Sequence, residues 1–206
     1  MRLKSKPWAK PLIGENPQLV QLDTQTITHQ PNYQHYALEI GTGKGDFIVG
    51  KMIQQSQTFF YGIERVTTVL AFALKKLLTQ KQTNVKLILG DFAKASYGMP
   101  DDFFDQIYLN FSDPWPKLRH HKRRLTALGN LEKINRILKA KGEIILKTDN
   151  LELFEFSLGN LIKMSYNITR IQRPYLQVED HDVMTEYERF FRDGQQPIYR
   201  LIAIKE

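Results

Sequence analysis

Residues 36–47 read YALEIGTGKGDF, an apolar run followed by a turn with three glycines at every second position, Gly41, Gly43 and Gly45. The apolar residues are consecutive, which is typical of a strand that helices cover on both faces. Glycine at a strand-to-helix turn permits positive φ and lets the backbone approach a ligand at the helix N-terminus. The stretch predicts the first strand, turn and helix of a doubly wound α/β domain.

Similar runs continue toward the C-terminus. Further strands are expected at residues 59–64, 85–89, 104–111 and 143–148, alternating with helices at 47–53, 69–78, 130–138 and 154–164. Residues 166–172 and 197–204 indicate two more strands, antiparallel at one edge. These elements predict an α/β, Rossmann-like fold with a mostly parallel, seven-stranded sheet and helices on both faces.

Residues 1–35 differ in composition from the rest of the chain. They are rich in Pro, Gln, Asn and Thr and show weak periodicity. Clusters of these residue types are typical of loops rather than of a separate domain. We therefore expect a partly flexible N-terminal arm at residues 1–35, followed by one domain at residues 36–206.

Composition bounds the class of protein. The chain has 206 residues, of which 42% are hydrophobic and 25% charged, which is ordinary for a globular protein. It has no cysteine, so disulfides, thiolate metal sites and a cysteine nucleophile are excluded. The start, MRLKSKPWAKPL, lacks the apolar segment of a signal peptide, and no run approaches the roughly 18 apolar residues of a membrane span. We expect a cytoplasmic protein.

The formal net charge of +7 is concentrated in two segments that contain no acid. Removing their nine cations leaves 20 basic against 22 acidic residues. Such localisation favours binding of a polyanion, although a solvated loop and a frayed tail would have the same composition. The cations are Arg2, Lys4, Lys6 and Lys10 in the first segment, and Lys117, Arg119, Lys122, Arg123 and Arg124 in the second.

Acidic residues stand at the ends of three successive predicted strands, where open α/β sheets bind ligands: Glu39, Glu64 and Asp91. Asp46 replaces the third glycine of the dinucleotide fingerprint, and Lys44 is followed by glycine rather than by Ser or Thr, so NAD and ATP are disfavoured. Each acid alone would also fit a helix N-cap, and the glycines a tight structural turn. The acid followed by alternating glycines resembles motif I of class I methyltransferases, whose cofactor is the cation S-adenosylmethionine.

The most specific segment, residues 108–125, reads YLNFSDPWPKLRHHKRRL. Together with KPWA, LEIGTGKG, YGIE, LKTDN, MTEYE and QPIYR, it resembles the bacterial tRNA (guanine-N7)-methyltransferase family over essentially the whole chain. The resemblance implies that residues 36–206 form an S-adenosylmethionine-dependent domain that methylates N7 of the variable-loop guanine, nucleotide 46 of tRNA. It also implies a catalytic role for Asp113 and a cofactor site made of Glu39, Gly41, Gly43, Glu64, Asp91 and Asp113.

The resemblance places the tRNA substrate on the second basic segment and on two later motifs. Pro114 and Pro116 stiffen the loop that carries Asp113, while Trp115 either stacks on a base or packs the loop against the core. Adjacent histidines without a nearby acid or cysteine do not indicate a metal, and we expect none. The expected substrate-binding residues are Lys117, Arg119, His120, His121, Lys122, Arg123, Arg124, Asp149, Thr185, Glu186, Tyr187 and Glu188.

Two other functions remain compatible with the residues. Acid-Pro-aromatic motifs also follow the fourth strand in enzymes that methylate exocyclic base amines, although Trp115 here separates two prolines that are usually adjacent. A non-catalytic RNA-binding protein would keep the basic surface, but it would have no need of the acids. The sequence gives no indication of the oligomeric state.

Overall fold

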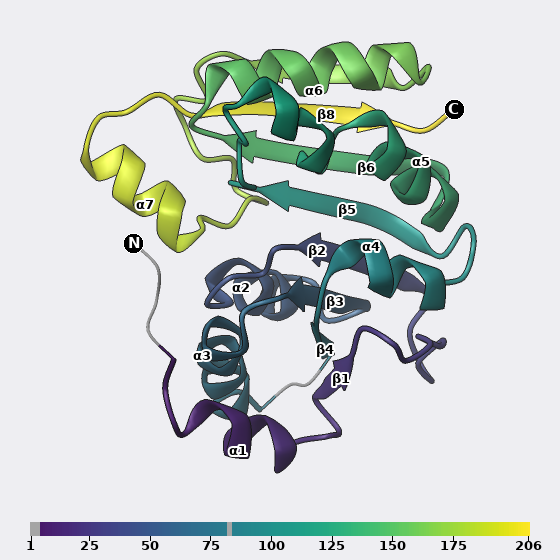
Figure 1. Ribbon diagram of the computed structural model, residues 1–206, viewed down its shortest axis with the longest axis vertical. Coiled ribbons are helices and arrows are strands. Elements are labelled where there is room, and N and C mark those ends of the chain that lie inside the picture. Colours follow the sequence, from purple (N-terminus) through teal and green to yellow (C-terminus); the bar gives the residue numbers. More distant parts are fainter. Residues whose placement is uncertain (1–4, 82–83) are drawn as a thin grey trace.

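The computed structural model describes residues 5–81 and 84–206, so Arg2 and Lys4 of the first basic segment lie outside the described residues. Figure 1 shows one central sheet flanked by helices. The strands are β1 (Val20–Leu22), β2 (His35–Ile40), β3 (Thr58–Glu64), β4 (Val85–Leu89), β5 (Phe104–Asn110), β6 (Leu138–Thr148), β7 (Asn167–Gln172) and β8 (Tyr199–Ile204). The helices are α1 (Ala9–Gly14), α2 (Asp46–Gln54), α3 (Thr67–Leu78), α4 (Phe92–Ala95), α5 (Leu128–Ile137), α6 (Leu151–Lys163) and α7 (Glu186–Asp193), with 3₁₀ turns η1 (Ser96–Gly98) and η2 (Leu118–Arg123).

The strand order is β1-β4-β3-β2-β5-β6-β8-β7, and every pairing is parallel except those of β8. The predicted Rossmann-like α/β class is therefore confirmed. Strand β2 lies at the centre, and the chain winds from it toward β3 on one side and later toward β5 on the other. In open sheets of this kind, ligands bind at the carboxyl ends of the strands beside this switch point.

In the described part of the chain, the sheet has eight strands rather than the seven expected. The additional strand, β1, comes from the segment expected to be an arm, and it pairs with β4 in the register Val20↔Leu87 to Leu22↔Leu89. Helix α1 lies against α3, where the ring of Trp8 meets that of Phe72 edge to face at 5.1 Å. Three residues of strand in a polar segment leave no periodic signal, so sequence patterns do not reveal them.

The last two strands pair antiparallel at one edge of the sheet, as expected. Strand β8 is antiparallel to both β6 and β7, so among the described strands β8 alone is reversed and β7 runs in the same direction as the parallel strands. Consequently β7 ends at the carboxyl edge of the sheet, and the chain passes through α7 there before it returns as β8. Figure 1 shows α7 at the edge toward which the arrows of β2, β5 and β6 point.

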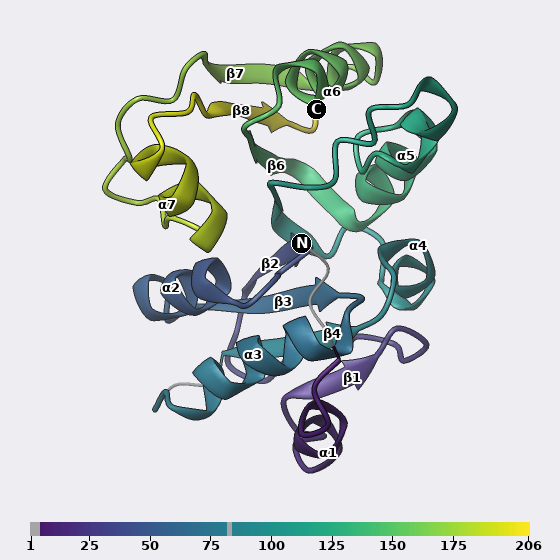
Figure 2. The same ribbon diagram turned by 60° about the vertical axis from the view of Figure 1, so that its left-hand side comes forward.

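The core consists of two apolar layers, one on each face of the sheet. Successive strand residues alternate between them: Ala37 and Phe60 pack with α2 and α3, whereas Leu38 and Tyr61 pack on the face that α4, α5 and α6 cover. Figure 2 shows these two groups of helices on opposite sides of the strands. Burial of both faces explains why the strands are apolar on consecutive residues. Within the described ranges, no helix has the length and apolarity needed to cross a bilayer.

Candidate active site

The glycine turn leaves open space beside the end of β2. Gly41, Gly43 and Gly45 have φ values of 87°, 60° and 85°, a region that other residues adopt at a cost. A Cβ atom added to Gly41 would meet nothing within 4 Å, whereas one added to Gly45 would lie 2.7 Å from Cβ of Ala73 in α3. The first glycine therefore faces free space, and the third permits close contact between α2 and α3.

Glu39 precedes this turn and is only 2% exposed. Its Oε1 accepts a hydrogen bond from Nδ2 of Asn110 at 3.0 Å, at the end of the neighbouring strand β5. Among the described residues, neither Oε2 of Glu39 nor Oδ1 of Asn110 has a hydrogen-bond partner, although both atoms are buried. Burial raises the pKa of Glu39 to about 8, against the lowering effect of the Asn110 hydrogen bond. Two unused acceptors at this position suit a cationic ligand with N–H groups.

Glu64 ends β3 and braces the glycine turn. Its Oε2 accepts a hydrogen bond from the backbone N–H of Gly43 at 3.2 Å, and its Oε1 accepts one from Val66 at 2.8 Å. Burial raises the pKa of Glu64, and these two backbone donors counteract the rise. The predicted acid therefore lies directly beside the predicted glycines.

Asp91 is exposed at the end of β4 and serves as the N-cap of α4, where its Oδ1 accepts from the backbone N–H of Ala93 at 2.8 Å. Its own backbone N–H donates to Oδ2 of Asp23 at 3.0 Å. The capping role is thus real, and a second carboxylate from the N-terminal segment adjoins it. Asp23 carries no sequence signal, because its place depends on the edge strand β1.

The loop after β5 presents Asp113 to solvent. Its Oδ2 forms an ion pair with Nη2 of Arg65 at 3.2 Å, which links the end of β5 to the end of β3. Two flanking residues, Phe111 and Trp115, have left-handed φ values of 49° and 43°, which are rare for bulky residues. Arg65 was not predicted as a site residue, although it directly follows the YGIE motif.

Trp115 packs beside the second basic segment. Its ring lies 5.8 Å from that of His120, at an interplanar angle of 89°, and the guanidinium of Arg123 lies over it at 4.9 Å. These contacts favour the loop-packing role for the indole. Most of the segment forms η2, which Lys117 precedes. The side chains of the segment are exposed or partly exposed at Lys117, Arg119, His120, Lys122 and Arg123.

The side chains of Arg124 and His121 instead face Glu152 at the start of α6. Arg124 is 1% exposed, with Nε donating to the Pro114 carbonyl at 2.7 Å and Nη2 to Oε1 of Glu152 at 2.6 Å. Protein groups already take these donors, so Arg124 does not present them to solvent as its neighbours do, and its role toward substrate stays a prediction. His121 is partly buried, with Nε2 3.5 Å from the same Glu152 oxygen.

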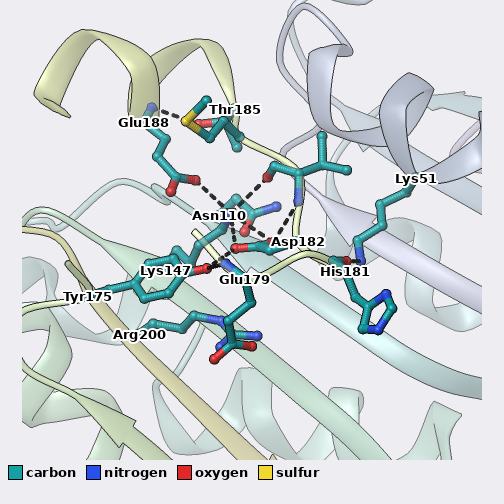
Figure 3. Close-up of polar contacts among 12 residues, drawn as sticks. Lys51, Asn110, Lys147, Tyr175, Glu179, His181, Asp182, Thr185, Glu188 and Arg200 are labelled. Carbon is teal, nitrogen blue, oxygen red and sulfur yellow. Dashed lines mark hydrogen bonds and ion pairs between the residues drawn. The ribbon is translucent and has the colours of Figure 1, made fainter. Parts of the chain in front are cut away.

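The LKTDN motif at the end of β6 has one lysine that is buried and one aspartate that is exposed. Lys147 is 0% exposed, and its Nζ donates to Glu188 Oε2 at 2.6 Å, to the Val183 carbonyl at 2.9 Å and to both Asp182 oxygens at 3.1–3.2 Å. Figure 3 shows this lysine at the centre of the polar contacts that hold the segment before α7. Asp149, two residues later, is exposed at the same edge.

The MTEYE motif likewise has an inner and an outer part. Glu188 is 0% exposed and pairs with Lys147 and Arg192, so it faces the protein, and its contact with substrate stays a prediction. Thr185 is the N-cap of α7, accepting at Oγ1 from the Glu188 N–H at 2.9 Å. Tyr187 is 63% exposed, and its ring is stacked on that of Phe111 at 6.5 Å.

Glu186 links the start of α7 to the glycine turn after β2, because it pairs with Lys44 of that turn at 2.7 Å. Four of the predicted residues therefore lie together at the carboxyl edge of the sheet, called the rim below: Glu64 contacts Gly43, Glu39 contacts Asn110, and Arg65 contacts Asp113. Asn110 and Asp182 were missed by sequence reasoning. Asn110 lies inside the NFSDPWPK segment, whereas nothing in the sequence marks Asp182. Over residues 5–81 and 84–206, no group of three His, Cys, Asp or Glu side chains is arranged to hold a metal ion.

Comparison with known proteins agrees with this geometry. Residues 33–201 match the family model described as "Putative methyltransferase". The tRNA (guanine-N(7)-)-methyltransferase of Limosilactobacillus reuteri is 41% identical over 98% of this chain and 99% of that protein. The enzyme of the same name from Oceanobacillus iheyensis is 40% identical over the full length of both chains.

A solved structure supports the fold. The precorrin-6y C5,15-methyltransferase of Geobacter metallireducens superimposes with a TM-score of 0.61 at 14% identity, covering 99% of this chain and 90% of that one. An identity this low supports the fold alone. The full-length similarity at about 40% identity shows the family, and the chain belongs to the bacterial tRNA (guanine-N7)-methyltransferase family.

Proposed function

We propose that this protein transfers a methyl group from S-adenosylmethionine to N7 of a guanine in tRNA, the variable-loop guanine that the family resemblance implies. We place this activity in the cytoplasm. The observation that carries the proposal is the rim itself. Buried acceptors on Glu39 and Asn110 lie beside an open glycine turn, and Asp113 and the exposed cations of η2 follow in the loop after β5.

The residues fit S-adenosylmethionine, which supplies an electrophilic methyl group on a positively charged sulfur. Glu39 and Asn110 offer unused buried oxygens to its N–H groups, and the ionised carboxylate of Glu39 offsets its positive charge. Gly41 and Gly43 leave room for close approach, since Cβ atoms there would meet nothing nearer than 4.0 Å. Glu64 is positioned for ribose hydroxyls and Asp91 for the adenine side of the site.

Asp113 would act on the guanine rather than as a strong base. N7 of guanine is an acceptor with a free lone pair, so it attacks without first losing a proton. The remaining task is alignment and stabilisation of the positive charge that develops on the purine. The exposed Asp113 carboxylate, held at the rim by Arg65, accepts hydrogen bonds from the guanine edge and balances that charge.

The tRNA would lie across η2 and α7. Lys117, Arg119, Lys122 and Arg123 present exposed cations to phosphates, which position the substrate without reading its sequence. On the opposite side of the rim, exposed Asp149 and Glu186 offer acceptors, while Thr185 holds the start of α7 in place. Tyr187, stacked on Phe111, offers a ring face of the kind on which an extruded base can stack.

The test is incubation of the protein with radiolabelled S-adenosylmethionine and unmodified tRNA, followed by digestion to nucleosides. The expected product is labelled 7-methylguanosine. Label in a base methylated on an exocyclic amine would instead support the related amino-methyltransferase activity. Binding of tRNA without any label would indicate an RNA-binding protein that lacks the chemistry. Either of these results would overturn the proposal.

A further inference from the structure

Arg124 differs from every other cation of the second basic segment in its surroundings. Lys117, Arg119, Lys122 and Arg123 are exposed, whereas Arg124 is 1% exposed at the point where the chain leaves η2. Burying a guanidinium is costly unless its donors and its charge are matched. The surroundings of Arg124 supply both requirements.

Three groups hold the guanidinium. Nε donates to the Pro114 carbonyl at 2.7 Å, and Nη2 donates to Glu152 Oε1 at 2.6 Å and lies 3.5 Å from the Trp115 carbonyl. The charged carbon also lies over the ring of Phe156 at 4.6 Å. The hydrogen bond and charge of Arg124 lower the pKa of Glu152. The planar fork of arginine therefore ties the loop after β5 to the first turn of α6.

The loop held in this way is in an unfavourable backbone conformation. Phe111 and Trp115, which flank Asp113 on either side, both have left-handed φ values. Bulky residues remain in that region only when surrounding contacts enforce it, and such strain is found at functional sites. On the N-terminal side, the backbone N–H of Phe111 donates to the Lys147 carbonyl at 2.7 Å. On the C-terminal side, Arg124 supplies the corresponding restraint.

We propose that Arg124 is a positioning residue for methyl transfer, which fixes the loop of Asp113 and Trp115 through Pro114 and Glu152, and that it is not an RNA contact. This inference rests on the proposed function, because it gives Arg124 its effect through Asp113. Arg124 therefore has a different role from its neighbour Arg123, although both residues are arginines of the same basic segment. Arg123 acts on the outer surface, where it lies over Trp115.

The first test is the substitution Arg124→Lys, which keeps the positive charge but cannot reach Pro114 and Glu152 with one planar group. The expected result is a fall in kcat at saturating tRNA of roughly 10- to 100-fold, the range caused by small misplacement of a reacting group. The dissociation constant for tRNA and its salt dependence should stay unchanged. The contrasting variant Arg119→Gln should raise KM for tRNA more than it lowers kcat.

A second readout follows the loop without any catalysis. The chain has two tryptophans, Trp8 and Trp115, so the Trp8→Phe variant reports on Trp115 alone by fluorescence. Adding Arg124→Lys should make Trp115 more accessible to quenching by acrylamide. Glu152→Gln, which weakens the tie while leaving Arg124 in place, should change kcat and quenching in the same direction by smaller amounts.

Wild-type kcat and wild-type quenching in Arg124→Lys would overturn the proposal. So would weaker tRNA binding with a reduced salt dependence and unaltered quenching, because that pattern belongs to a phosphate contact. If Arg124→Lys folds poorly, Glu152→Gln decides by the same two measurements. Absence of 7-methylguanosine with the wild-type protein would count against the proposed function instead, while the quenching comparison would still test the hold of Arg124 on the loop.

Discussion

At the scale of single residues, the rim combines carboxylates in very different environments. Glu39 is 2% exposed with an unpartnered oxygen among the described residues, whereas Asp113 lies in solvent beside Arg65. Their proposed tasks differ accordingly. A buried acid next to the glycine turn suits a cationic ligand, and an exposed acid on a restrained loop suits an incoming base.

Replacing Asp113 with Asn keeps its size but removes the charge that would balance the methylated purine. We expect kcat to fall by roughly 10²- to 10³-fold, the usual effect of deleting one electrostatic contact to a transition state, with a much smaller loss of cofactor affinity. Single-turnover methylation and calorimetric cofactor titration measure the two quantities. Asp102→Asn, which alters only an exposed carboxylate paired with Lys205, is the matched control. Unchanged turnover in Asp113→Asn would refute its role.

The pKa of Glu39, about 8 in the free protein, predicts a pH dependence of cofactor binding. Below pH 8 the carboxyl group is mostly protonated, and a cationic cofactor favours the ionised form, so binding should release a proton. Affinity should therefore rise with pH by up to about tenfold per unit below that pKa and level off above it. Calorimetry in buffers of different ionisation enthalpy counts the released protons. Equal proton release by wild type and Glu39→Gln would contradict the prediction.

At the scale of elements, the segment before α7 and α7 itself are fastened to the sheet by buried charges. Lys147 bonds Asp182 and Glu188, and Lys51 of α2 donates to the His181 carbonyl at 2.6 Å, as Figure 3 shows. The sequence motif identifies this region but does not reveal which of its acids point inward. Adjacent acids in a helix start look alike until the packing is known.

Lys147→Met should lower the free energy of unfolding by about 3–5 kcal/mol, because it removes the cation paired with buried Asp182 and one of the two cations paired with buried Glu188. Lys44→Met removes a half-exposed partner of Glu186 and should cost no more than about 1 kcal/mol. Urea denaturation followed by circular dichroism compares the two lysines directly. Similar losses in both variants would contradict the contrast between buried and surface pairs.

The 3₁₀ turn η2 should account for much of the salt dependence of tRNA binding. Each phosphate contact that is lost reduces the slope of log affinity against log salt by about 1. The double variant Arg119→Gln, Lys122→Gln should therefore bind tRNA more weakly and with a slope shallower by about 2. Lys163→Gln, an exposed lysine at the end of α6, is the control. A salt-independent affinity in the wild type would exclude phosphate anchoring at this turn.

At the scale of the whole molecule, the N-terminal segment belongs to the same packed body as the sheet. Strand β1 extends the sheet edge, and Ile27 is 2% exposed within the core, with its backbone N–H donating to the Gly98 carbonyl at 2.9 Å. Asp23 from the same segment reaches the rim beside Asp91. A segment expected to be an arm thus contributes to both the core and the site edge.

Ile27→Ala should therefore reduce the free energy of unfolding by about 2–5 kcal/mol, as for other buried aliphatic residues. Leu22→Ala, at a position that is 52% exposed in β1, should change it by no more than about 0.5 kcal/mol. Thermal and urea unfolding measure both variants. An Ile27→Ala protein as stable as the wild type would mean that the segment is not part of the cooperative unit.

The sequence predicted the alternating strands and helices because their apolar runs are long and are bounded by turns. It also located the rim, since carboxyl ends of parallel strands meet at one edge. What it could not supply were the facts that depend on packing: the short strand β1, and the inward orientation of Arg124 and Glu188. A charged side chain looks the same in a sequence whether it faces water or a buried partner.

The close approach of Gly45 to Ala73 has a consequence for related domains. Gly41 borders open space, whereas Gly45 sets how closely α2 can approach α3, because a side chain there would push the two helices apart. The alternating glycines thus encode interhelical spacing as well as room for a ligand. In other domains with such a turn, we expect that a glycine at the third position is accompanied by a small residue at the facing position of the next helix, because both are needed for the same close contact.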